Sequence, residues 1–267
     1  MGKGTENLMP KRIVAIINQK GGVGKTTTSI NLACGIAMLG RKVLLVDLDP
    51  QAHSTIVLGS SPDSYSATIQ DVLVNRKEIS GVIIKSSIDN LDLAPSNIHL
   101  DKAEQLLIPE MFRETRLSKA LSGLDYEFII IDCRPTLGIL SVNALYACNM
   151  VLIPCEMARF SLEGYSDLLD MIRLLKRGDY ESGKVALRIL FCKFDSRKAI
   201  SNEWVFKQLE PYKSILFKTC IRQCEALNQA HIAKESIFKF KPASHGAEDY
   251  LSLTKEFMIL CSQPEIN

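Results

Sequence analysis

The chain lacks long hydrophobic runs and has few glycines and prolines. Among 267 residues there are 15 Gly and 10 Pro, while 46% of the residues are hydrophobic and 23% are charged. Disordered chains have far less apolar content, so this composition predicts a folded protein with a full core. A membrane span needs roughly 18 consecutive apolar residues, whereas the longest apolar runs here are short ones such as 13–17 and 128–131. We therefore expect no transmembrane segment.

The first twelve residues lack the features of a targeting peptide. They contain neither an apolar core nor a small-residue cleavage site. Glu6 does not fit the myristoylation pattern. We therefore expect a cytoplasmic protein.

Paired cysteine motifs are absent as well. The eight cysteines are scattered, and none forms a CxxC pair. Cys220 and Cys224 are four residues apart, but no His ligand is near them to complete a zinc site. The pattern predicts reduced thiols in the core, and neither a disulfide scaffold nor a metal site.

The charges are nearly balanced overall but unevenly distributed. The net charge is +2, yet residues 184–241 carry 12 Lys and Arg against 5 Asp and Glu. Such asymmetry is a weak indication of an anionic partner such as nucleic acid. A solvated basic face is at least as consistent with the charges alone.

Short apolar runs alternate with longer stretches of helical period, a pattern typical of a parallel sheet covered by helices. The expected strands are 12–17, 42–47, 91–94, 128–132, 151–154, 187–193 and 215–219. The expected helices are 25–39, 99–122, 138–148, 161–177, 200–211, 225–235 and 247–262. This order predicts a doubly wound α/β fold with a mostly parallel sheet, in which ligands bind at the carboxyl ends of the strands. Residues 60–90 are the least regular part and are expected to be an insertion or a mobile segment.

A glycine-rich loop follows the first strand and opens into the first helix. The residues expected to bind a nucleotide are Lys20, Gly21, Gly22, Val23, Gly24, Lys25, Thr26 and Thr27. Glycines allow backbone N–H groups to turn toward a phosphate, and the helix adds its positive end. Lys25 is expected to reach the terminal phosphates and Thr26 to bind Mg²⁺. The motif therefore predicts a bound nucleotide together with Mg²⁺.

The run from Lys20 to Thr28 resembles the deviant Walker A motif of the ParA/MinD-type P-loop ATPases. The resemblance extends over nearly all of residues 12–262, and small ParA partition proteins of the Soj type are the most similar in pattern. It implies one P-loop ATPase domain at 12–267, after a short extension at 1–11, and ATP as the nucleotide cofactor. It also implies that Lys20 crosses to the nucleotide of a partner subunit, where a second cation stabilises charge that develops in hydrolysis. Lys20, Lys25 and Asp49 are then the catalytic residues.

Three aspartates at strand ends complete the expected site. Asp47 and Asp49 alternate at the end of the second strand, so both carboxylates lie on one side of it. By resemblance, Asp47 lies near the Mg²⁺ ion and Asp49 orients the attacking water. Asp132 ends a buried apolar strand, as in the Walker B motif, where the carboxylate holds Mg²⁺ or its water. The expected metal residues are therefore Thr26, Asp47 and Asp132.

The chain departs from the family pattern at several positions. Ala52 and His53 replace the usual Gly and Asn, and we expect His53 to be an exposed loop residue without catalytic duty. Arg134 is an unusual charge in the segment that follows Asp132, which is the second switch of the family. We expect its side chain to contact solvent and not a phosphate or a partner subunit. Relatives often carry arginines in the segment 221–230, where this chain has only Arg222.

The resemblance implies a partition ATPase that forms an ATP-bound homodimer with two nucleotides between the subunits. Such a dimer binds DNA without sequence preference, and a ParB-type centromere-binding partner stimulates hydrolysis. It would be cytoplasmic and associated with the nucleoid, with no membrane contact. DNA attachment needs cations near phosphates, and the candidates are Arg197, Lys198 and Arg222.

Three alternatives remain open from the sequence alone. A MinD-like membrane-cycling ATPase needs a basic amphipathic helix at its C-terminus, but Lys255 is the sole base after Lys241, so the apolar stripe there is better explained as core. An iron–sulfur reductase of the nitrogenase iron-protein type needs cysteines at the dimer face, and Cys133 is the only one near a switch. A nucleotide-binding scaffold without turnover is the third alternative.

Overall fold

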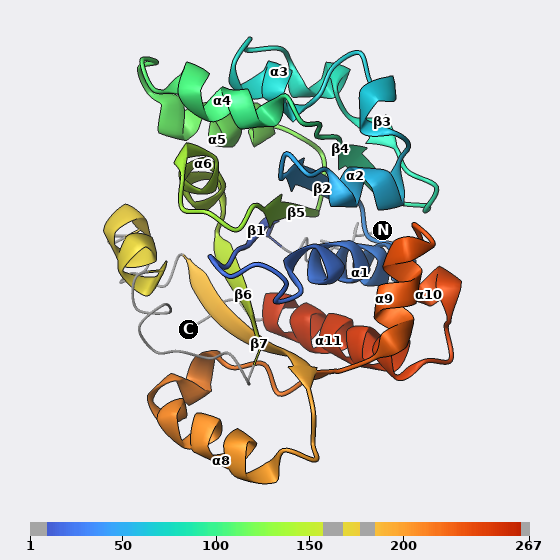
Figure 1. The fold of residues 1–267 in the computed structure, drawn as a ribbon. Helices are drawn as coiled ribbons and strands as arrows, with labels where there is room; N and C mark the ends of the chain where they lie inside the picture. The colour runs from blue at the N-terminus through green and yellow to red at the C-terminus, as the bar shows by residue number, and fades with distance from the viewer. Residues whose placement is uncertain (1–9, 157–167, 177–184, 263–267) are drawn as a thin grey trace, which may run out of the picture.

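The computed structural model describes residues 10–156, 168–176 and 185–262. Its centre is an eight-stranded sheet with the order β3-β4-β2-β5-β1-β6-β7-β8 (Figure 1). The strands are β1 Arg12–Ile16, β2 Val43–Leu48, β3 Ile84–Lys85, β4 Leu91–Ala94, β5 Phe128–Cys133, β6 Met150–Glu156, β7 Ala186–Phe194 and β8 Ile221–Arg222. Only the short β3 at one edge pairs antiparallel within the described residues. The doubly wound, mostly parallel fold expected from the sequence is confirmed.

Helices cover both faces of this sheet. The α-helices are α1 Lys25–Met38, α2 His53–Leu58, α3 Ile69–Leu73, α4 Leu100–Leu107, α5 Arg116–Leu121, α6 Ile139–Ala147, α8 Ala199–Gln208, α9 Glu225–Ile232, α10 Ile237–Phe240 and α11 His245–Ser262. Short 3₁₀ turns are η1 Pro62–Ser64, η2 Ile79–Gly81, η3 Arg113–Thr115 and η5 Glu210–Ile215. Residues 168–176 are also helical. In Figure 1, α1 and α11 lie together on one side of the central strands, and α4 to α6 lie on the other.

The sheet is buried on both faces because its central strands are apolar at nearly every position. Successive residues of β1 alternate between two core clusters, with Val14 and Ile16 in the cluster of α1 and α11 and Ala15 in the other. All six residues of β5 are buried in the same way. Continuous apolar strands of this kind are typical of parallel sheets between two helical layers. The carboxyl ends of β1, β2 and β5 are thereby held side by side.

The structure corrects two expectations from the sequence. The helix expected at 99–122 is broken into α4, η3 and α5, because Pro109 follows the end of α4 and Phe112 has a φ of 57°. The strand expected at 215–219 is reduced to a single bridge at Leu216, since η5 occupies the preceding residues and the paired strand is β8. The segment 60–90, expected to be the least regular part, contains only the short elements η1, α3, η2 and β3.

One expected helix is tested only in part. Of the helix expected at 161–177, residues 168–176 are helical and the others lie outside the described residues.

No helix in the described part of the chain is long and apolar enough to cross a membrane. The apolar stripe of α11 is core, as expected, because Leu253 and Phe257 are fully buried.

Candidate nucleotide site

The expected site residues meet where β1, β2 and β5 end. β5 lies between β2 and β1, and in the β2–β5 register Asp47 is directly paired with Asp132. The glycine-rich loop leaves β1 at the same edge and enters α1 (Figure 1). The topology therefore brings the three aspartates to the phosphate loop, as the strand pattern predicts.

Two glycines shape the phosphate loop. Gly22 and Gly24 have φ values of 72° and 99°, in the left-handed region that other residues adopt only with strain. Gly24 is the N-cap of α1, where no side-chain cap is found in the described structure and the first turn carries no acid. The N–H groups at the start of α1 are therefore open to an anion, which the positive end of the helix favours.

Lys25 is buried at the base of this loop. The residue is only 7% exposed, and its Nζ donates a hydrogen bond to the Lys20 carbonyl at 2.9 Å. Burial lowers the pKa of Lys25, while the charges of Asp132 and Asp49 act in the opposite direction. A phosphate bound here would meet a cation that has already lost most of its water, which strengthens the attraction.

The start of the loop is tied to the neighbouring strand. The Lys20 N–H donates to Asn18 Oδ1 at 3.0 Å, and Asn18 Nδ2 donates to the carbonyl of Pro154 in β6 at 2.8 Å. Lys20 is half-buried. The backbone of Lys20 is thus fixed by β6.

Asp132 is enclosed by hydroxyl groups. It is 1% exposed; Oδ1 accepts from Ser29 Oγ at 2.9 Å and Oδ2 accepts from Ser54 Oγ at 2.8 Å. The Thr26 side chain also hydrogen-bonds this carboxylate. Asp132 therefore connects the phosphate loop, the helix α1 and the helix α2.

Asp47 is held by the beginning of α2. It is fully buried, and Oδ2 accepts from the Thr55 N–H at 2.8 Å and from Thr55 Oγ1 at 2.7 Å. Oδ1 accepts from the Asp49 N–H at 3.2 Å. Both oxygens of Asp47 thus accept hydrogen bonds from the residues that follow β2.

Asp49 differs from the other two aspartates because it is partly exposed. Its Oδ1 accepts from the Gln51 N–H at 2.9 Å, and its backbone carbonyl accepts from Ser96 Oγ at 2.8 Å. The loop is therefore fixed through the Asp49 backbone, and the carboxylate remains at the surface of the site. Such a carboxylate can bind a water molecule.

The buried carboxylates disfavour each other's charge. Burial and the neighbouring Asp132 raise the pKa of Asp47 to about 8. Burial also raises the pKa of Asp132, against the hydrogen bonds from Ser54, Ser29 and Thr26. A cation bound among these groups would reverse this penalty.

The donor set suits magnesium held jointly with a nucleotide. Mg²⁺ prefers oxygen ligands and is usually bound by one or two carboxylates, waters and substrate phosphates. Thr26 and Asp132 offer such oxygens next to the loop, and Asp47 pairs with Asp132 in the β2–β5 register. Asp47 and Asp132 each accept three hydrogen bonds from described residues, and a carboxylate has about four lone-pair sites, so each keeps a site for a cation. No group of three or more His, Cys, Asp or Glu side chains forms a separate metal site in the residues that the structure describes.

The sequence pattern does not reveal the hydroxyl groups around the aspartates. Ser29, Ser54, Thr55 and Ser96 each donate to Asp132, Asp47 or the Asp49 carbonyl. Their local signal is a small polar residue within a buried segment, because all four are fully buried. Buried hydroxyls need partners, so such positions indicate polar contacts although they do not identify them.

Two departures from the family pattern have defined contacts. His53 is exposed, as expected, but it begins α2, and its ring lies 5.1 Å from the ring of His231 in α9. The expectation that Arg134 faces solvent is wrong. Its side chain is 17% exposed and pairs with Asp101 at 3.2 Å and Glu104 at 3.0 Å, because α4 packs beside the end of β5.

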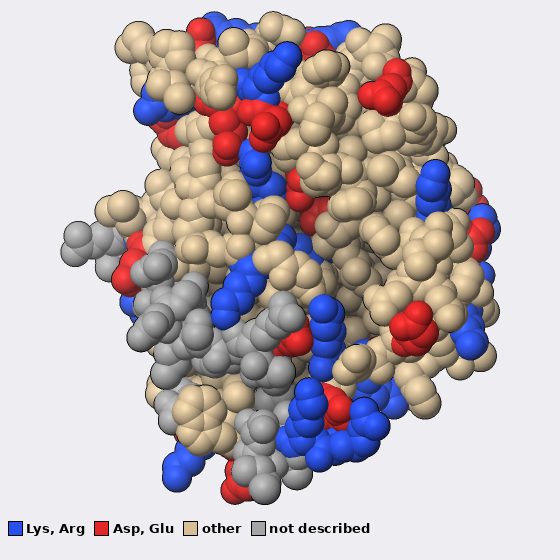
Figure 2. Space-filling model, in the orientation of Figure 1, with Lys and Arg blue, Asp and Glu red and all other residues tan. Residues whose placement is uncertain are grey.

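The basic region that follows the end of β7 is built differently from the nucleotide site. Figure 2 shows Lys and Arg side chains gathered in the lower part of the view, near the end of β7. Arg197 is exposed, but its guanidinium donates to both oxygens of Asp195 at 2.8 and 2.9 Å and lowers the pKa of that carboxyl to about 2. Lys198 is exposed at the start of α8.

Arg222 is bound to acids of α11. Its guanidinium donates to Asp249 Oδ1 at 2.6 Å and to Glu248 Oε2 at 2.6 Å, and its N–H donates to Asp249 Oδ2 at 2.8 Å. Asp249 is 6% exposed, so Arg222 offsets a nearly buried charge. Arg222, one of the three residues expected to contact DNA, therefore also stabilises the packing of β8 against α11.

Comparison with known proteins decides the family. A family model described as an AAA domain matches residues 11–185. The sporulation initiation inhibitor protein Soj of Bacillus subtilis is 38% identical over 247 residues, which are 92% of this chain and 97% of that protein. The chain belongs to the ParA/MinD-type P-loop ATPases. It is of the Soj-like kind within them, since the chromosome partitioning protein ParA of Myxococcus xanthus is 39% identical over 92% of this chain and 88% of its own length.

The fold of this ParA/MinD-type ATPase also matches a solved structure with nucleotide. Cobyrinic acid a,c-diamide synthase from Mycobacterium smegmatis, crystallised with an ATP analog and magnesium, is 30% identical with a TM-score of 0.79. The match covers 94% of this chain and 95% of that one. The ATPase family expected from the loop motif is therefore confirmed by sequence and by fold.

The iron–sulfur alternative finds no support in the ParA/MinD-type structure. Cys133 is 1% exposed, and burial raises its pKa well above the ordinary value. A cluster between subunits needs accessible thiolates. All eight cysteines are free thiols, six of them buried.

Proposed function

We propose that this ATPase is a partition protein that binds Mg-ATP at the loop after β1 and acts as a dimer on DNA. The observation that carries the proposal is the meeting of the phosphate loop with Asp49 and Asp132 at one edge of the sheet. Its similarity to Soj and ParA supports the partition role. The ATP analog and magnesium in the similar synthase structure support the choice of ligands.

The loop residues divide the binding of ATP among them. Backbone N–H groups from Gly21 to Thr27 surround the phosphates, and Lys25 neutralises the terminal ones. Thr26 and Asp132 hold the magnesium ion, whose charge offsets that of the phosphates. Asp47 accepts hydrogen bonds from Thr55 and from the Asp49 N–H, and so holds the segment that follows β2 in place near the ion.

Hydrolysis needs a positioned water and a cation on the departing charge. Asp49 orients the water, since it is the partly exposed carboxylate of the three. Lys20 provides its cation to the nucleotide of the partner subunit, and its backbone is anchored to β6 at the start of the loop. The two nucleotides then lie between the subunits, and hydrolysis separates them.

DNA binding follows from dimerisation. Arg197, Lys198 and Arg222 of two subunits would form one cationic surface that contacts several phosphates at once. A ParB-type partner would then stimulate hydrolysis and release the dimer, so the protein would be found in the cytoplasm on the nucleoid. Residues 12–267 act as one ATPase domain in this scheme, preceded by the extension 1–11.

An ATPase assay with and without DNA, and with the protein encoded beside this one, tests the proposal. We expect slow hydrolysis by the chain alone and a clear increase when both are present. Hydrolysis that neither DNA nor the neighbouring protein changes would contradict the partition role and leave a simple ATPase.

A further inference from the structure

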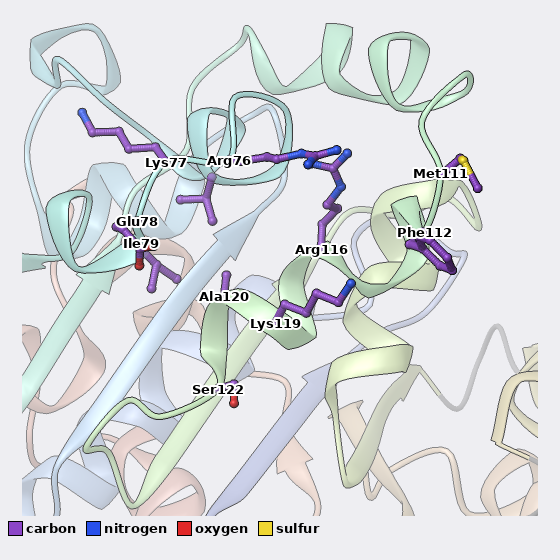
Figure 3. Close-up of a pocket in the computed structure, with 11 residues that line it drawn as sticks. Arg76, Lys77, Glu78, Ile79, Met111, Phe112, Arg116, Lys119, Ala120 and Ser122 are labelled. Atoms are coloured by element: carbon purple, nitrogen blue, oxygen red, sulfur yellow. The ribbon is translucent and has the colours of Figure 1, made fainter.

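A second pocket lies apart from the nucleotide site, between α3, η2 and α5 (Figure 3). Its volume is about 320 Å³, within the lower range of small-ligand sites. None of the nucleotide-site residues described above lines it. Ser122, at one end of the pocket, follows α5 and precedes β5, so the pocket is at the amino-terminal side of that strand.

The pocket is strongly cationic. Four bases line it, Arg76, Lys77, Arg116 and Lys119, against the single acid Glu78. Arg116 is 9% exposed, and its Nη1 atom is buried with no hydrogen-bond partner among the described residues. A buried guanidinium with an unsatisfied donor is costly unless an anion completes its contacts.

Glu110 shows which anion these arginines accept. Its Oε2 accepts hydrogen bonds from Arg116 Nη2 at 2.5 Å and from Arg76 Nη2 at 3.4 Å. Figure 3 shows the two guanidinium groups side by side. The side chain of Glu110 is 41% exposed, and Glu110 is not among the residues that line the pocket. It therefore occupies the place that an external carboxylate would take.

Apolar groups adjoin the charges. Val72 and Ile79 are buried and line the pocket, while Met111 and Phe112 are 76% and 63% exposed at its margin. Phe112 has a φ of 57°, which is strained for an aromatic residue, and Lys119 Nζ lies 5.4 Å from its ring centre. Exposed apolar groups next to a built polar site are typical of an interaction surface.

We propose that this pocket binds an acidic peptide segment of a partner protein. A carboxylate of the segment displaces Glu110 from Arg76 and Arg116, and a neighbouring apolar side chain enters over Val72 and Ile79. Glu110 is then a resident competitor that weakens the binding. The positive charge of the pocket excludes basic segments, and its apolar floor favours a segment that carries acidic and apolar side chains together.

Fluorescence anisotropy with a fluorescein-labelled peptide of alternating Glu and Phe tests the proposal on the full chain. We expect Arg76→Glu and Lys119→Glu each to weaken binding about tenfold, since both side chains are exposed and their replacement spares the fold. The matched control Lys255→Glu, on α11, should bind like the parent. Glu110→Gln should tighten binding several-fold, an effect that a damaged fold would not produce.

Two further peptides separate the contributions. A peptide of alternating Gln and Phe tests the charge, and one of alternating Glu and Ser tests the apolar contact. Both should bind at least about tenfold more weakly than the Glu and Phe peptide. If either of them bound as tightly as the Glu and Phe peptide, or if Arg76→Glu and Glu110→Gln left the affinity unchanged, the proposal would be overturned.

Discussion

The nucleotide site and the basic region near the end of β7 hold their charges in opposite ways. At the nucleotide site Asp47 and Asp132 are nearly inaccessible, and each is held by hydroxyl or N–H donors from other elements. In the basic region Arg197 is exposed, and its guanidinium pairs with the acid two residues away. Asp132 is thus held by long-range contacts, whereas Arg197 is paired with a near neighbour in the sequence.

This difference explains how each region can act. Buried, mutually fixed groups can place a phosphate and a water molecule with little freedom, as catalysis requires. Exposed cations with local partners give no defined geometry, but they attract a polyanion regardless of its sequence. Substitutions should therefore have sharp effects in the first region and graded effects in the second.

Lys25→Ala should have the largest effect. The loop would lose its main charge on the phosphates, and we expect the affinity for ATP to fall at least about 100-fold. Isothermal titration calorimetry with Mg-ATP measures it, with Lys42→Ala as control because Lys42 forms its ion pair at the surface. If Lys25→Ala bound ATP with the parental affinity, Lys25 would not contact the phosphates as we propose.

Lys20→Gln should separate binding from hydrolysis. We expect ATP affinity within a few-fold of the parent but hydrolysis reduced about 100-fold, because the cation acts across the dimer in the transition state. A coupled phosphate-release assay measures the rate. A parental rate would show that Lys20 has no catalytic role in this chain.

Asp49→Ala should retain ATP while failing to orient water, so the dimer persists. Size-exclusion chromatography with Mg-ATP should show a dimer that lasts longer than that of the parent. The backbone contact from Ser96 to Asp49 is kept in this variant, so the loop should stay folded. A variant that binds ATP but remains monomeric would contradict the role of Asp49.

Ser54→Ala tests the long-range hydrogen bonds of the nucleotide site. Without one donor to the buried Asp132, the free energy of unfolding should fall by about 1–3 kcal/mol. Urea denaturation measures it against Ser64→Ala, which removes an exposed hydroxyl. Equal stability of the two variants would show that the hydroxyl enclosure of Asp132 is dispensable.

Arg197→Gln should have the smallest effect and should leave stability unchanged. The slope of log DNA affinity against log salt should become shallower by roughly 0.9 for each DNA phosphate that the variant no longer neutralises. Arg173→Gln is the matched control, since Arg173 is exposed and also pairs with a nearby aspartate. An unchanged slope would place the DNA-binding surface elsewhere. Arg222 is less suitable, because replacing it also leaves the buried charge of Asp249 unpaired.

The same contrast explains what the sequence predicts and what it does not. The phosphate loop and the three aspartates were predictable because they follow buried strands whose carboxyl ends must meet. The donors Ser29 and Ser54 were not, since Asp132 lies 103 and 78 residues away from them in the sequence. Arg134 was wrongly expected in solvent for the same reason, because its acids lie on α4.

Secondary structure differs from expectation where local signals were overruled or overlooked. Pro109 divides the helical pattern of 99–122, and this signal is visible in the sequence. The strand β8 was not foreseeable from its two residues alone, because it exists only through pairing with β7. The basic excess of 184–241 overstates the charge that DNA could meet, since Arg188 within it is 5% exposed.

The central claim is that ATP at the nucleotide site controls DNA binding at the basic region. A mobility-shift assay with DNA of arbitrary sequence at low salt, with and without Mg-ATP, tests it most directly in the parent and in Lys25→Ala. The account predicts retardation by the parent only with Mg-ATP and none by Lys25→Ala. Equal retardation with and without ATP, or retardation retained by Lys25→Ala, would contradict it.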